Sequence, residues 1–320
     1  MKRTYYLLLG LLTVTVSCAK FPQTEISNGI IRATIYLPDS RDGYYQGTRF
    51  DWSGSMASLE FKGHSYISQW FEKYSPEIHD AIMGPVEEFT PLDYEKTKQG
   101  GSFMKIGVGI LTRPDDKEYQ FYRLYPVMNH GEWKVKTQPD QVLFIHELSD
   151  RAYSYHYEKI VSLTKDKPEL VLSHTLRNTG TQTIETSVYD HNLFVIDKQP
   201  TGPGFDVSFP YNITGEFPEL GDMAEIRGNK IVYLRKLTDG EQVYCDTIKG
   251  FGNSAKDYDI RIENHNTKAG VRITSDQPIL ILGFWSCSTT VCPEPYINIK
   301  VDPGQEFSWK ISYEFYTLAE

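Results

Sequence analysis

The residues best suited to proton transfer lie in two segments that are far apart in the sequence. YDHNLFVID carries His191 in a predicted β-strand, and STTVCPEPYINIKV carries Glu294 between two prolines. Pro293 and Pro295 fix the backbone, so we expect them to hold Glu294 on a stiff loop that leads into the strand YINIKV. A carboxylate in a partly apolar pocket can act as a general base, and an unperturbed imidazole, with a pKa of ~6.5, can act as a general acid.

Each of the two residues also has an ordinary structural interpretation. Strand histidines are commonly hydrogen-bonded and inert, and a lone Glu beside prolines is commonly structural or solvated. Asp190 is not a candidate, because alternation along the strand places it on the face opposite to His191. The chemical interpretation therefore requires folding to bring the two segments together.

The elements that must position these residues are predicted to be strands. Aromatic residues make up 13% of the 320 residues, and segments such as GIIRATIYL, YSYHYEKIVSL and FSWKISYEFYTL alternate between apolar and polar types. Such segments recur to the end of the chain, and no Pro-, Gly- or Ser-rich linker divides them. We predict an all-β chain with one sandwich domain over residues 29–320, in which the irregular stretch 68–103 is a functional or lid-like loop.

The N-terminus has the pattern of an export signal. Residues 1–18 place two positive charges before a short apolar run and end in Thr15-Val16-Ser17-Cys18, similar to a bacterial lipobox. We expect Cys18 to be lipidated and residues 19–28 to form a tether, which gives an exported periplasmic or outer-membrane lipoprotein whose lipid anchor is its one contact with a membrane. The alternative is an ordinary secretory leader with an incidental cysteine.

Charge and cysteine content limit the partners. The net charge is −9 and no Lys/Arg run is present, which argues against nucleic acid and favours a neutral ligand. No Cys/His spacing suggests a zinc site and no dinucleotide motif is visible, so neither a metal nor a cofactor is expected. Cys287 and Cys292 could bridge a short loop or remain two free thiols, and the spacing leaves both open.

The order of the motifs resembles that of the galactose mutarotase-like family, the aldose 1-epimerases. GYYQGTRFDWSGSMASLEFKGHSY is similar to the family's opening hairpin, and the later landmarks are His191-Asn192-Leu193-Phe194, Glu294, Pro303-Gly304-Gln305 and Tyr313-Glu314-Phe315. The resemblance spans about residues 28 to 318 and implies a large antiparallel β-supersandwich. The family's early H-G-G motif is missing; EIHDAIMGPVEEF occupies that region, where His79 or Glu87 could replace the lost ligand contact.

The resemblance implies an isomerase that interconverts sugar anomers, with Glu294 as base, His191 as acid and no cofactor. Arg49 could donate hydrogen bonds to sugar hydroxyls, and Trp52 or Trp70 could stack on the C–H face of the sugar. The alternatives are a surface ion pair of Arg49 with Asp51 or a neighbour, and core positions for both tryptophans.

Two other functions stay open on the sequence alone. A carbohydrate-binding protein would keep the fold and the pocket without turnover. A glycan-cleaving enzyme normally needs two carboxylates across the scissile bond, and Glu294 is the one strong candidate. The sugar could be a free monosaccharide or the reducing end of an oligosaccharide.

Overall fold

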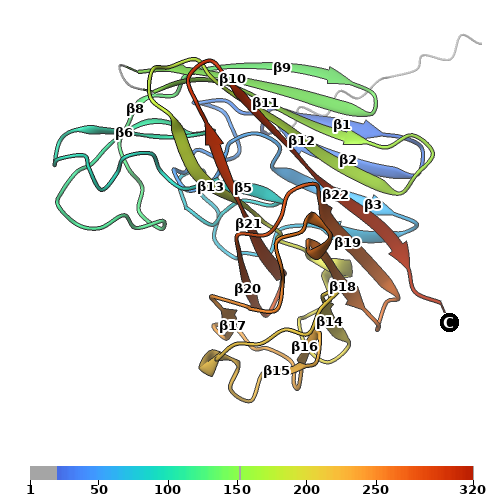
Figure 1. Cartoon of the computed structure of the whole chain (residues 1–320). Helices are drawn as coiled ribbons and strands as arrows, with labels where there is room; N and C mark the ends of the chain where they lie inside the picture. Colours follow the sequence, from blue (N-terminus) through green and yellow to red (C-terminus); the bar gives the residue numbers. More distant parts are fainter. Residues whose placement is uncertain (1–19, 151–152, 320) are drawn as a thin grey trace, which may run out of the picture.

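The computed structural model describes residues 20–150 and 153–319, and these residues form antiparallel sheets with three short 3₁₀ turns (Figure 1). The predicted leader and Cys18 lie outside the described residues. Within the described part of the chain, no helix has the length and hydropathy needed to cross a bilayer. The 3₁₀ turns are η1 (Ile196–Lys198), η2 (Pro218–Leu220) and η3 (Ala255–Asp257).

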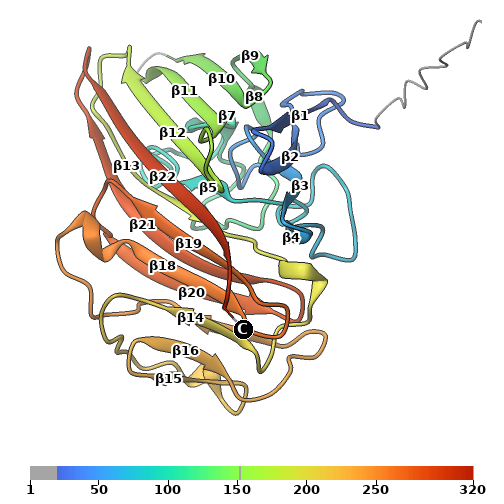
Figure 2. The same ribbon diagram turned by 90° about the vertical axis from the view of Figure 1, so that its right-hand side faces the viewer.

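A ten-stranded sheet runs through the molecule from β9 at one end to β15 at the other (Figures 1 and 2). Its long central strands alternate strictly between buried and partly exposed residues, as the sequence pattern predicts. In spatial order the strands are β15 (Ala224–Arg227), β16 (Lys230–Tyr233), β14 (Phe205–Ser208), β18 (Asp259–Asn264), β19 (Ala269–Ser275), β22 (Glu306–Thr317), β12 (Glu169–Asn178), β11 (Ser154–Leu163), β10 (Gln141–Ser149) and β9 (Glu132–Gln138).

A five-stranded sheet packs against the ten-stranded one and carries both residues singled out for chemistry. Two smaller sheets complete the fold. The five strands, in spatial order, are β17 (Gln242–Cys245), β20 (Ile281–Cys287), β21 (Val291–Val301), β13 (Ile184–His191) and β5 (Val86–Phe89). The smaller sheets are β1 (Gln23–Ser27), β2 (Ile31–Tyr36), β3 (Met56–Phe61) and β4 (His64–Ile67), and β6 (Ser102–Lys105), β7 (Gly109–Thr112) and β8 (Val127–Asn129).

Three local expectations from the sequence are wrong. Residues 23–27 of the predicted tether form β1, which pairs with β2 because Ile26 enters the core. The stretch 68–103 is not one irregular loop, since it contains β5 and the start of β6. Glu294 and its flanking prolines lie inside β21 rather than on a loop before a strand.

Buried charges join the two large sheets. Glu87 on β5 is fully buried and forms an ion pair with Lys159 on β11, while its other oxygen lies 2.7 Å from Nε2 of His174 on β12. Burial alone would raise the pKa of Glu87, but Lys159 and His174 outweigh it and lower the pKa to about 2. Nearby, the Tyr313 hydroxyl donates to Asp190 at 2.6 Å. A buried carboxylate requires such partners, so these contacts fix how the sheets face each other.

We predict that Glu87→Gln destabilises the protein by about 3–5 kcal/mol, because it leaves Lys159 buried without its counter-charge. Urea unfolding at pH 7 measures the loss. The matched control is Glu185→Gln on β13, where a 65% exposed side chain should change stability by less than about 0.5 kcal/mol.

The same pair predicts a pH dependence. Folding lowers the pKa of Glu87, so the ionised side chain stabilises the folded state fully above its unfolded pKa of ~4.3. This stabilisation is lost as the pH falls through the folded pKa of about 2. The stability gap between wild type and Glu87→Gln should therefore narrow from pH 4 to pH 2. A constant gap would contradict this assignment.

Candidate active site

One face of the five-stranded sheet forms the floor of a cavity of about 810 Å³. Alternation along each strand decides which of its residues line the cavity, because positions i and i+2 of a strand share a face. Tyr189 and His191 from β13 therefore enter the cavity together with Glu294 and Tyr296 from β21. The other lining residues are Arg49, Trp70, His79, Asp80, Glu88, Thr90, Tyr119, Phe121, Tyr122, Gln242, Tyr244 and Trp285.

The strand pairing brings the two key segments to the same place. β13 and β21 pair in register from Ile184 opposite Val301 to Tyr189 opposite Tyr296, and these two tyrosine rings stack at 4.3 Å. Beyond that point the pairing is interrupted; the side chain of Asn192 donates to the Pro293 carbonyl at 2.8 Å, and the backbones pair again at Phe194 opposite Val291. His191 and Glu294 lie in this interruption.

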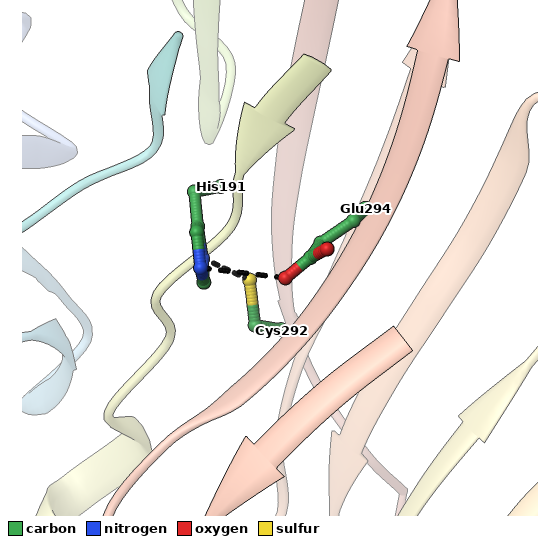
Figure 3. A group of neighbouring side chains, drawn as sticks. All are labelled: His191, Cys292 and Glu294. Carbon is green, nitrogen blue, oxygen red and sulfur yellow. Dashed lines mark hydrogen bonds and ion pairs between the residues drawn. The ribbon is translucent and has the colours of Figure 1, made fainter. Parts of the chain in front are cut away.

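His191 and Glu294 contact each other directly. Nε2 of His191 lies 3.3 Å from Oε1 of Glu294, and Nδ1 lies 2.7 Å from the sulfur of Cys292 (Figure 3). His191 is 5% exposed and Glu294 is 8% exposed, so both lie deep in the cavity. Gly283 on β20 sits opposite Glu294, and a Cβ at position 283 would come within 3.4 Å of the carboxyl oxygen.

Burial makes the neutral form of both groups the stable one. Desolvation, with support from Glu88 and Asp80, raises the pKa of Glu294 to about 8 against the opposing effect of Arg49. Desolvation and the positive charge of Arg49 lower the pKa of His191 to about 3. The expectation that His191 is protonated at neutral pH is therefore wrong, and the pair carries one proton, held by Glu294.

Arg49 organises the opposite side of the cavity. Its Nε donates to Glu88 at 2.7 Å, its Nη2 donates to the Tyr189 hydroxyl at 3.0 Å, and its Nη1 pairs with Asp80. His79 holds the second oxygen of Asp80 at 2.9 Å. Arg49 and Lys105 lower the pKa of Glu88 to about 2 despite its burial, so Glu88 stays ionised and serves as a hydrogen-bond acceptor.

The structure separates the predicted ligand residues into two groups. Arg49, Trp70 and His79 line the cavity beside the His191–Glu294 pair, although Arg49 pairs with Asp80 and Glu88 rather than with Asp51. Trp52 and Glu87 do not line the cavity. Trp52 lies in the core, donates to the Gly47 carbonyl at 2.8 Å and packs on His130 at 4.9 Å.

The register of β5 explains why Glu87, predicted from the sequence as a possible ligand residue, does not reach the cavity. In the segment Val86-Glu87-Glu88-Phe89, Glu88 lies opposite Tyr189 and faces the cavity, whereas Glu87 lies opposite Asp190 and faces the other sheet. The sequence could have indicated Tyr189 and Tyr296 by alternation from His191 and Glu294. It gave no signal for Asp80, Tyr119, Phe121, Tyr122, Tyr244 or Trp285, which other segments supply.

No disulfide joins Cys287 to Cys292, so the cysteine pair considered from spacing is not bridged. Two groups of described residues have ligand atoms close enough for a cation: His191, Cys292 and Glu294, and Asp206, Glu263 and His265. In the first group, Cys292 and Glu294 contact different nitrogens of one imidazole. A single ion bound through either nitrogen would therefore engage only one of them unless the side chains rearranged.

Comparison with solved structures shows which fold these sheets define. A GalM/aldose epimerase homologue from C. elegans superposes with a TM-score of 0.58 at 12% identity, covering 93% of this chain and 99% of that one. A galactose mutarotase-like protein from Lactobacillus casei superposes with a TM-score of 0.52 at 13% identity, covering 92% of this chain and 100% of that one. A galactose mutarotase related enzyme from Lactobacillus acidophilus superposes with a TM-score of 0.51 at 11% identity, covering 93% of this chain and 98% of that one.

These similarities confirm the predicted all-β, galactose mutarotase-like fold, a large antiparallel β-supersandwich. The identities are low, and what the comparison shows is the fold. No family model and no curated protein sequence matches the chain.

The contacts of His191 predict its tautomer. Glu294 holds the proton of the pair, so its carboxyl group donates a hydrogen bond to Nε2 of His191. The proton of the neutral imidazole then lies on Nδ1, which donates to the sulfur of Cys292. We expect ¹⁵N shifts of the His191 ring to report a neutral Nδ1–H form at pH 7, and Cys292→Ala to move the ring towards a mixture of tautomers. Cys292→Ser, which keeps an acceptor, is the matched control. A neutral Nε2–H form in the wild type would contradict this prediction.

Proposed function

We propose that the protein is an aldose 1-epimerase-like isomerase that interconverts the anomers of a sugar by opening and closing its ring. The observation that carries this proposal is the buried His191–Glu294 pair, separated by 3.3 Å at the floor of the cavity. Burial lowers the pKa of His191 and raises that of Glu294, which favours one proton on the pair at neutral pH. Ring opening needs one proton delivered to the ring oxygen and one removed from the anomeric hydroxyl. A pair with a single transferable proton supplies one donor and one acceptor.

The short separation suits the geometry of a hemiacetal. The ring oxygen and the anomeric hydroxyl oxygen are bonded to the same carbon, so the acid and the base must reach two neighbouring atoms. Glu294 would protonate the ring oxygen while Nε2 of His191 takes the hydroxyl proton. The bond from C1 to the ring oxygen then breaks and C1 becomes a carbonyl carbon. Rotation about the C1–C2 bond and closure with the proton transfers reversed give the other anomer.

The assignment of acid and base differs from the one expected from the sequence. His191 was expected to donate and Glu294 to accept. Burial instead leaves the proton on Glu294 in the free protein, so Glu294 is the donor in ring opening and His191 is the acceptor. The two groups exchange these roles when the ring closes, because the reverse reaction retraces the same path.

The rest of the cavity supports sugar binding. Aromatic faces such as Tyr296 and Trp285 can pack on the C–H face of a sugar, and the ionised Glu88 and Asp80 can accept hydrogen bonds from its hydroxyls. Glycan cleavage is less well supported, because the other two carboxylates of the described lining, Glu88 and Asp80, are both paired with Arg49, which disfavours either as a second reacting carboxylate.

We expect Glu294→Gln and His191→Asn each to lower the rate of anomer exchange at least about 100-fold, because each removes one of the two proton-transfer groups. NMR exchange spectroscopy on a reducing sugar measures the rate. Glu185→Gln and His156→Asn, which change surface side chains of the same types, should retain full activity. If either site variant kept the wild-type rate while remaining folded, its residue would have no part in proton transfer.

The rate of anomer exchange should depend on pH through the number of protons that His191 and Glu294 carry together. One proton is present between the pKa of His191, about 3, and that of Glu294, about 8. We therefore expect kcat/KM for anomer exchange, after subtraction of the spontaneous reaction, to be level near pH 6–7 and to fall tenfold per pH unit above about 8 as the pair loses its proton. A rate that rises through pH 8 would contradict the one-proton mechanism.

A further inference from the structure

We propose that the sugar bound in this cavity is the reducing end of a neutral oligosaccharide rather than a free monosaccharide. This inference rests on the proposed function and specifies its substrate class. It follows from the size of the cavity, the position of its aromatic side chains and the pairing of its charges.

The cavity is larger than one sugar requires. Its volume of about 810 Å³ lies in the upper part of the range of about 300–1,000 Å³ in which proteins bind drug-sized ligands. A single hexose is smaller than such ligands. The proton-transfer pair is deeply buried, so the anomeric carbon must reach the floor and the remaining volume lies towards the opening.

Aromatic side chains form two walls of the cavity. Trp70 and Trp285 contact each other at 5.3 Å, and Trp285 also contacts the His191 ring at 5.7 Å. On the other wall, Phe121 and Tyr122 lie 6.1 and 6.4 Å from the His79 ring. The walls come from strands and loops that are distant in the sequence, and both belong to the lining of the same cavity.

The aromatic residues nearest solvent have surfaces that one buried sugar would not cover. Phe121 is 45% exposed, Tyr122 is 54% exposed and Tyr244 on β17 is 43% exposed, yet all three line the cavity. Large exposed apolar side chains beside a cavity typically mark a binding surface. Further sugar units attached to the reducing end would extend from the floor to these rings and pack on them.

The charges of the cavity favour a neutral ligand. Among the described residues that line it, Arg49 is the one Lys or Arg side chain, and Glu88, Asp80 and Tyr189 take up all three of its nitrogens. Lys105 behind this group is bonded to Glu88 and to the Tyr119 hydroxyl. A phosphate or uronate would meet two carboxylates, and the one Lys or Arg side chain in the described lining is already paired with both of them.

The test compares anomer exchange of monosaccharides with that of neutral trisaccharides that carry α-1,4, β-1,3 and β-1,4 linkages. We expect kcat/KM for at least one trisaccharide to exceed that of its own reducing-end monosaccharide at least tenfold. Glucose 6-phosphate and glucuronate should be exchanged more slowly than glucose. If no trisaccharide exceeds its monosaccharide, or if the anionic sugars are preferred, the inference is wrong.

Variants at the opening locate the added contacts. Tyr122→Ala and Tyr244→Ala should each lower kcat/KM for the preferred trisaccharide by about two- to tenfold, and by more than for the monosaccharide. Tyr122→Phe should retain the preference because it keeps the ring. Leu124→Ala is the matched control, because Leu124 is exposed on the same loop but does not line the cavity. An equal loss for both sugar sizes would contradict a role in holding the extra units.

Titration calorimetry separates this inference from the proposed function. Exchange of monosaccharides without a gain for any trisaccharide would refute the oligosaccharide and leave the isomerase activity in place. Trisaccharide binding that is weakened by Tyr122→Ala, in a protein that exchanges no sugar, would support the oligosaccharide site and refute the isomerase activity. Neither binding nor exchange would refute both.

Discussion

The structure depends on the buried ion pair between Glu87 and Lys159, which joins the five-stranded sheet to the ten-stranded one. Glu87 satisfies Lys159 and His174 at once, and none of these side chains has access to solvent as an alternative. A shift of β5 by one residue in one direction would place Val86 against Lys159 and leave its charge unpaired, and a shift in the other direction would place Phe89 in the position from which Glu88 pairs with Arg49. The two ion pairs of β5 therefore fix its register.

That register decides which groups enter the cavity. With Glu87 turned towards the ten-stranded sheet, alternation turns Glu88 towards Arg49 and Tyr189 on the other side. The neighbouring strand repeats the pattern, since Asp190 bonds to Tyr313 between the sheets while His191 faces Glu294. One face of the sheet holds buried structural contacts and the other holds the proton-transfer pair, so the two functions occupy adjacent residues without sharing side chains.

Much of the fold could be predicted from the sequence, because alternation is a local property. The strand pattern gave the all-β fold, and the relation between His191 and Asp190 followed from alternation within one strand. Strand pairing is not local, and this is why Glu87 was preferred to Glu88 and why Trp52 was placed near a ligand. The pKa of His191 also escaped prediction, since it depends on burial and on Arg49, which is remote in the sequence.

The two prolines beside Glu294 have a role beyond stiffness. The Tyr296 carbonyl accepts a hydrogen bond from Leu280 on the β20 side, so in the alternating backbone Pro293 and Pro295 present their nitrogens to the β13 side. Proline has no amide hydrogen, so β21 cannot donate to β13 at these two positions, and pairing resumes in the same register at Phe194 opposite Val291. The backbone of β21 thus interrupts its own hydrogen-bonding pattern beside the proton-transfer pair, while the strands stay joined on both sides of the interruption.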